Sequence, residues 1–158
     1  MDDMQKIISA LMDNELAVSE LYKVYATRFP EMADFWNHLA NDEENHAEWI
    51  KTLNEEISKG NMVINPNRFK LPSLQGLYDY IMGLIYKARR DDIPLTNINA
   101  LALSKSLEDA LIEKRFFEIF ETDSVMLKNV LNKLRIATEK HREIVAVELE
   151  RTNSIQGK

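Results

Sequence analysis

The sequence predicts an all-α protein, and two observations carry this prediction. Only four glycines and four prolines occur in 158 residues, which leaves little room for the turns of a β-rich fold. Apolar residues also recur every three or four positions along four long segments, as they do on one face of an α-helix. The length suits a single domain with one hydrophobic core. We assign residues 1–151 to this domain and residues 152–158 to a flexible tail.

The first two helices are expected to form a hairpin. One runs from about Asp2 to Arg28, and Pro30 then interrupts the pattern because proline disfavours a helix interior. Proline suits the first positions of a helix, so the second helix should begin at Pro30 and run to about Lys59, where a glycine follows.

The stretch 60–95 breaks the helical rhythm. Residues 61–72 predict an extended crossover, and residues 73–90 predict a short apolar helix with Ser73 as its cap. This crossover helix is expected to cover the bundle or a partner subunit.

The last two helices are expected to form a second hairpin. A third long helix should span about 97–121 with Thr96 as its cap, and Asp123 or Ser124 could cap a fourth helix that runs to about Arg151. Two hairpins joined by a long crossover that contains a short helix are the arrangement of a ferritin-like four-helix bundle. An ordinary up-and-down bundle is the alternative that periodicity leaves open.

Composition and charge exclude several classes of function. The formal net charge of −6 and the lack of a basic cluster argue against a nucleic-acid partner. No apolar run approaches the roughly 20 residues that cross a bilayer, and the N-terminus lacks the apolar segment of a signal peptide. We therefore expect no membrane association and a cytoplasmic location. The absence of cysteine excludes disulfides, thiolate catalysis and iron–sulfur clusters within the chain.

Glu43 is the most informative residue of the sequence. It lies on an apolar stripe of the second helix between Leu39 and Ile50, and His46 follows one turn later. A carboxylate in a helical core costs several kcal/mol unless a cation or hydrogen bonds compensate for its lost hydration. Glu and His three residues apart share one helical face and can reach the same metal ion.

The same intrusion of polar groups recurs on two other helices. Glu15 interrupts the apolar stripe of the first helix, and His141 interrupts that of the fourth. A single buried Glu or His is more often a hydrogen-bonded core residue than a ligand. Three helices with the same anomaly favour a metal site. His38, the remaining histidine, lies off these stripes and is interpreted as a surface residue.

Four stretches of the chain carry a resemblance to a known family. They are Glu15 followed by Leu21-Tyr22, LANDEENHAEWI at 39–50, ALALSKSLEDALIEKRFF at 100–117 and TEKHREI at 138–144. Together they resemble the rubrerythrin-like branch of the ferritin-like family over nearly the whole chain. In that family each hairpin supplies an inward Glu and a Glu-x-x-His pair, and the six residues hold two iron ions.

The resemblance implies a ligand set that is complete only in its first half. Glu15, Glu43 and His46 match the family's first hairpin. In the second hairpin His141 matches, but Thr138 stands where the family has a glutamate. The neighbouring Glu139 points about 100° away on an ideal helix, so it cannot simply replace that glutamate.

The third helix offers two further candidates, Glu108 and Glu113. Glu108 follows an Ala-Leu-rich stretch as the family's ligand does, whereas Glu113 is ringed by apolar residues. The two alternatives, or both together, stay open. With one of them the site has three carboxylates and should hold one divalent ion tightly or two unequally. With both, the charge of two ions is balanced. Iron is expected, and manganese or zinc would suit the same ligands.

The resemblance implies redox chemistry with peroxide or oxygen at a mono-iron or di-iron site. Such an enzyme would need an external electron donor, and a homodimer is expected as the commonest assembly. The alternative is a degenerate bundle that binds a metal for structure or sensing, or binds none and acts as an interaction module. Tyr22 and Tyr25 could be redox-active, but aromatic residues at helical spacing mostly serve packing.

Overall fold

The computed structural model describes residues 3–65, 71–112 and 120–156. Its elements, in chain order, are α1 (Asp3–Arg28), the 3-10 helix η1 (Pro30–Met32), α2 (Ala33–Ser58), β1 (Val63–Ile64), α3 (Leu71–Ala88), α4 (Asn97–Ile112), β2 (Phe120–Glu121) and α5 (Val125–Gln156). Helices account for most of the described residues, so the all-α prediction is confirmed. In these ranges no helix has both the length and the hydropathy needed to span a membrane.

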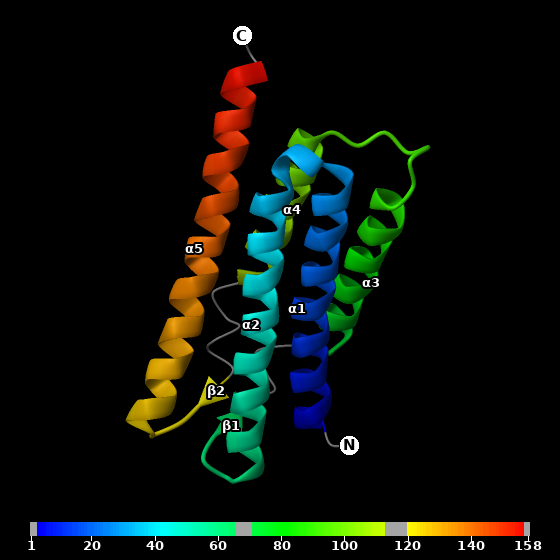
Figure 1. Ribbon diagram of the computed structural model, residues 1–158. Helices are drawn as coiled ribbons and strands as arrows, with labels where there is room; N and C mark the ends of the chain where they lie inside the picture. The colour runs from blue at the N-terminus through cyan, green and yellow to red at the C-terminus, as the bar shows by residue number, and fades with distance from the viewer. Residues whose placement is uncertain (1–2, 66–70, 113–119, 157–158) are drawn as a thin grey trace.

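The helices pack as two pairs with one additional helix on the outside. Figure 1 shows α1 and α2 running antiparallel beside each other, and these two helices are in close contact. The helices α4 and α5 pack against each other. The helix α5 also contacts α2, which joins the two pairs. The helix α3, which lies in the crossover between the pairs, packs along α1. As a result, α1, α2, α4 and α5 surround the interior of the molecule.

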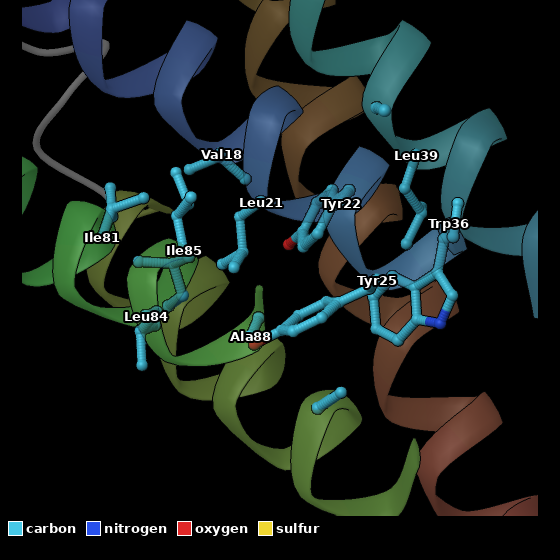
Figure 2. Packing of buried hydrophobic residues seen from close by; sticks show 14 of the residues in the cluster. Val18, Leu21, Tyr22, Tyr25, Trp36, Leu39, Ile81, Leu84, Ile85 and Ala88 are labelled. Atoms are coloured by element: carbon cyan, nitrogen blue, oxygen red, sulfur yellow. The ribbon is translucent and has the colours of Figure 1, made fainter. Parts of the chain in front are cut away.

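A cluster of aromatic side chains ties three of these helices together. The Trp36 ring is fully buried, and its centroid lies 4.9 Å from that of Tyr25 and 5.5 Å from that of Tyr22. Its indole Nε1–H donates a hydrogen bond to Asn97 Oδ1 at 3.1 Å. Figure 2 shows this cluster beside the aliphatic residues that α1 and α3 contribute. Trp36 therefore links α1, α2 and the first residue of α4.

The predicted N-terminal cap of α4 at Thr96 is confirmed, and of the two candidates for α5, Asp123 and Ser124, the structure selects Ser124. Thr96 Oγ1 accepts a hydrogen bond from the Asn99 N–H at 3.1 Å, and Ser124 Oγ accepts one from the Leu127 N–H at 3.3 Å. Each contact satisfies a backbone donor that has no partner within its helix. Gly60 follows α2 with a φ of 79°, a conformation that glycine adopts without steric cost.

Two helix starts differ from the prediction. The second helix does not begin at Pro30: a 3-10 turn comes first, closed by the Met32 N–H donating to Phe29 O at 2.8 Å, and α2 starts at Ala33. Ser73 is not the cap of the crossover helix, because α3 already includes the two residues before it. Pro72 fits there since the first turn of a helix needs no proline N–H.

Two helix ends also differ. Phe120 and Glu121, expected at the end of a helix, form β2 and pair antiparallel with Ile64 and Val63. Phe120 is buried in this pairing, so a partner distant in sequence decides its conformation. The last helix continues to Gln156 rather than ending near Arg151.

Truncation of Trp36 should destabilise the fold strongly. We expect Trp36→Ala to lower the free energy of unfolding by about 3–5 kcal/mol, because it leaves a cavity where three helices meet. Denaturant titration followed by circular dichroism measures this loss. Tyr86→Ala, which removes an aromatic ring that is 60% exposed, is the control and should cost less than about 1 kcal/mol. Equal losses in the two variants would contradict the role given to Trp36.

Candidate metal centre

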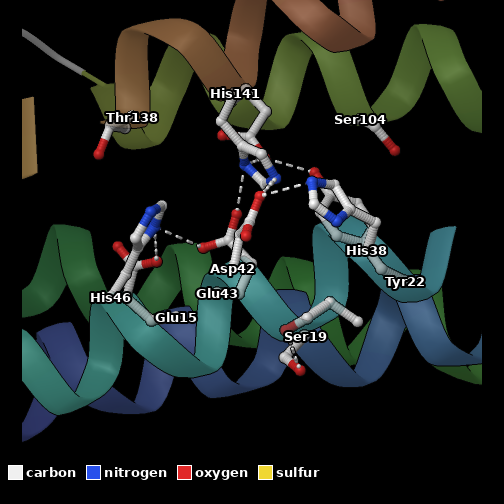
Figure 3. A network of polar contacts seen from close by, with 12 residues as sticks. Glu15, Ser19, Tyr22, His38, Asp42, Glu43, His46, Ser104, Thr138 and His141 are labelled. Carbon is white, nitrogen blue, oxygen red and sulfur yellow. Dashed lines mark hydrogen bonds and ion pairs between the residues drawn. The ribbon is translucent and has the colours of Figure 1, made fainter. Parts of the chain in front are cut away.

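Five ionisable side chains meet in the interior of the molecule. They come from all four inner helices and are Glu15 of α1, Glu43 and His46 of α2, Glu108 of α4 and His141 of α5. Glu15 is the most exposed of them at 7%. Figure 3 shows the labelled members of the group projecting from facing helices towards one another. The structure thus brings together five of the six residues selected from the sequence. The sixth, Glu113, lies outside the described residues.

The first three of these side chains form one possible metal-binding group. His46 Nδ1 lies 3.3 Å from Glu43 Oε2 and 3.5 Å from Glu15 Oε2. Glu43 and His46 share a face of α2 because they are three residues apart, and Glu15 reaches them from the antiparallel helix. All three ligand atoms lie within 4.8 Å of one another, so a single ion could contact them all.

A second group uses the other oxygen of Glu43. His141 Nδ1 lies 2.8 Å from Glu43 Oε1 and 3.1 Å from Glu108 Oε1. These atoms also lie within 4.8 Å of one another. Glu43 belongs to both groups, so the two possible ion positions are adjacent and share one carboxylate.

Hydrogen bonding leaves several of these buried atoms unsatisfied. Within the described part of the chain, Glu15 Oε2, Glu43 Oε1, His46 Nδ1 and His141 Nδ1 make no well-aligned hydrogen bond. In the absence of a metal they contact one another as ion pairs, at 2.8–3.5 Å. A divalent cation would satisfy all four at once, because carboxylate oxygens and imidazole nitrogens are its ordinary ligands. The donor set therefore fits a metal ion.

The position expected to lack a carboxylate does lack one. Thr138, one turn before His141, is buried, and its hydroxyl donates a hydrogen bond to the Leu134 carbonyl at 2.7 Å. Glu139 pairs with Arg135 at the surface and lies outside the buried group. Among the described residues the site thus holds three carboxylates and two imidazoles.

Comparisons of the chain with known protein families, with curated proteins and with solved structures find no match. The interpretation of the site therefore depends on its own geometry and chemistry.

Two contacts next to the centre were not predicted from the sequence. The Tyr22 hydroxyl donates a hydrogen bond to Glu108 Oε1 at 2.6 Å, and Asp42 Oδ2 lies 3.7 Å from His141 Nε2. Tyr22 follows Glu15 by seven residues, which places both on one face of α1, and this spacing could have indicated the contact. Asp42 gave no signal, because a partly exposed carboxylate beside Glu43 looks like an ordinary surface residue.

Burial and crowding of charge alter the proton affinities of the first group. Burial, followed by the charge of Glu43, raises the pKa of Glu15 to about 8. Burial alone would lower the pKa of His46, but Glu15 and Glu43 outweigh it and raise that pKa to about 10. At neutral pH the metal-free protein therefore holds protons where a cation would bind.

The second group follows the same pattern. Burial opposes protonation of His141, but Glu108 and Glu43 outweigh it and raise the pKa of His141 to about 11. Burial and the charge of Glu108 oppose ionisation of Glu43, but its contacts with Glu15 and the two imidazoles hold its pKa below the usual range. At neutral pH Glu43 is thus an anion between two protonated imidazoles when no metal is bound.

The stability of the metal-free protein should fall as the pH rises through the neutral and mildly alkaline range. In the folded state His46 keeps its proton up to about pH 10, whereas in the unfolded chain it loses the proton near 6.5. The stabilisation is therefore complete below pH 6.5 and is lost as the pH approaches 10. The raised pKa of Glu15 likewise makes the stability of the folded protein fall as the pH rises from 4.5 to about 8.

Melting temperatures of chelator-treated protein, measured across this window, test the expected fall. His46→Gln should show a smaller fall, because the raised pKa is removed with the imidazole. His38→Gln replaces a surface imidazole and should behave as the wild type. A wild-type melting temperature that stays constant or rises over this range would contradict the prediction.

Proposed function

We propose that this protein is a ferritin-like, rubrerythrin-like metalloprotein that binds iron among Glu15, Glu43, His46, Glu108 and His141. One observation carries the proposal: three carboxylates and two imidazoles converge in the interior around the shared Glu43. In the described ranges no lysine or arginine pairs with any of the three carboxylates. The packing of α1 with α2 and of α4 with α5, with α3 in the crossover, supports the ferritin-like arrangement.

The charges favour unequal occupancy of the two adjacent positions. Three carboxylates and two neutral imidazoles carry three negative charges, whereas two divalent ions carry four positive ones. In a buried site the excess charge weakens the second ion. We therefore infer one tightly held ion and a weaker second one. Ligands of this type suit iron, and they also suit manganese and zinc.

Bound iron would supply one-electron chemistry with peroxide or oxygen, as it does in rubrerythrin-like proteins. The residues of the chain would hold the metal and shield it from bulk water, because every proposed ligand is buried. Tyr22 would orient Glu108 through its short hydrogen bond. The chain contains no cysteine that could hold an iron–sulfur cluster as an internal electron donor, so the proposal includes an external one.

A structural or sensing metal is the second candidate function. It is favoured by Thr138, which occupies the place of a ligand and directs its hydroxyl to the backbone of its own helix. A site with fewer ligands can retain an ion that stabilises the bundle without turnover.

Removal of Glu43 should abolish metal binding. Changes to residues that merely support ligands cost about 10–100-fold in metal affinity, so loss of the shared carboxylate in Glu43→Ala should cost more than about 100-fold. Metal analysis after anaerobic loading with Fe²⁺ measures this loss. Glu44→Ala is the matched control, because the adjacent Glu44 pairs with Lys23 at the surface.

The same samples separate the two candidate functions. Rapid oxidation of bound iron by peroxide in wild type and Glu44→Ala, but not in Glu43→Ala, supports the redox function. Stoichiometric metal that peroxide does not oxidise supports the structural or sensing function. A wild-type protein that binds no iron, manganese or zinc at stoichiometric levels would overturn the metalloprotein proposal.

Addition of a carboxylate at position 138 should strengthen the weaker ion position. We expect Thr138→Glu to raise the bound metal from about one ion towards two per chain, because a fourth carboxylate balances the second divalent charge. Isothermal titration with Mn²⁺ under anaerobic conditions measures the stoichiometry. Thr52→Glu adds the same charge on the exposed face of α2 and should leave it unchanged. An equal response of the two variants would contradict the inferred position of the missing ligand.

A further inference from the structure

A hollow of about 280 Å³ lies between α2 and α5 beside the candidate metal centre. Both imidazoles of the centre, His46 and His141, line it. Asp42 and His38 line it as well, and neither belongs to the proposed ligand set. The hollow is therefore the place where the buried ligands meet an additional carboxylate and imidazole.

These residues form a continuous series from the surface to the interior. The His38 side chain is 70% exposed, and its Nε2 lies 3.6 Å from Asp42 Oδ2. Asp42 is 33% exposed, and the same oxygen lies 3.7 Å from His141 Nε2. His141 Nδ1 in turn lies 2.8 Å from Glu43 Oε1. Figure 3 shows the series running from His38 through Asp42 to His141.

The inner end of the series has an unsatisfied atom. His141 is only 2% exposed, and its Nε2 makes no hydrogen bond among the described residues. Asp42 Oδ2 lies 3.7 Å from this nitrogen, whereas Glu43 and Glu108 contact the other nitrogen, Nδ1. His141 thus presents one nitrogen to Glu43 and Glu108 and the other to Asp42, which lines the hollow with it.

We propose that Asp42 and His38 form an outer cation-binding position, and that divalent metal ions pass through it to the buried centre. The inference rests on the proposed function, because it concerns how that centre is loaded. A metal ion pays a large desolvation cost on leaving water for a buried site. A carboxylate and an imidazole at the entrance replace part of the hydration shell before the ion reaches Glu43. The negative charge of Asp42 also raises the local concentration of cations.

A transit position has a kinetic signature that a supporting residue lacks. It contacts the ion only during passage, so its loss slows entry and exit by the same factor and leaves the final affinity unchanged. If Asp42 only oriented His141, its loss would instead change the affinity by about 10–100-fold, as changes behind a metal ligand do. His38 does not contact His141 in the described structure, so a variant of His38 separates the two roles.

Stopped-flow mixing of chelator-treated protein with Co²⁺ tests the proposal, with the visible absorption of the bound ion as the readout. Exit is measured by mixing the loaded protein with excess chelator. We expect each of the variants His38→Gln and Asp42→Asn to slow both the entry and the exit of Co²⁺ by about ten-fold. In His38→Gln the stoichiometry and the final spectrum should be unchanged. Lys140, which lines the same hollow, repels cations, so Lys140→Gln should speed entry. Glu48→Gln removes an exposed charge of α2 that does not line the hollow and should match wild type.

The His38→Gln result decides the outcome. Wild-type entry and exit rates in this variant would overturn the transit position, even if Asp42→Asn altered the affinity, because Asp42 would then serve only to orient His141. Wild-type protein that binds no Co²⁺ would overturn the proposed function together with this inference. Normal Co²⁺ binding with unaffected rates would overturn the inference alone.

Discussion

The contact of the Glu43 carboxylate with two imidazoles is the interaction on which the rest of the structure depends. One carboxylate oxygen faces His46 of the same helix, and the other faces His141 of α5. A buried carboxylate without compensation costs several kcal/mol, so α2 can bury this face only where α5 supplies positive charge or a shared cation. The packing of α2 against α5 and the charge balance of the candidate metal centre therefore depend on each other.

The hydrophobic core and the candidate metal centre are continuous, and Tyr22 connects them. Its ring packs against Trp36, whereas its hydroxyl donates to Glu108. Trp36 in turn holds the start of α4 through Asn97, and α4 carries Glu108. The position of this carboxylate is thus set by aromatic packing on one side and by a short hydrogen bond on the other. Side chains held by a packed core are preorganised, which would reduce the cost of ordering them around a bound ion.

Most of the candidate site could be predicted from the sequence because helical periodicity is a local property. Glu15, Glu43 and His141 were recognisable as polar residues on apolar stripes, and each is buried in the structure. The spacing of Tyr22 from Glu15 places it on the same face of α1, but its partner Glu108 and the contact of Asp42 with His141 could not be found in this way, because each depends on a side chain from another helix. The conformation of Phe120 was wrongly predicted for the same reason: its strand partner is Ile64, more than fifty residues earlier in the chain.

The sequence by itself determined the helical class, the cap at Thr96, the two candidates Asp123 and Ser124 for the next cap, and the residues that must be buried despite their charge. These depend on spacing and on neighbours within one turn, so they can be read without coordinates. Only the tertiary structure decided that Glu43 is shared by two groups, that Glu108 belongs to one of them, and that Asp42 lies behind His141. Distances between helices follow from how their side chains pack, and no local pattern contains that information.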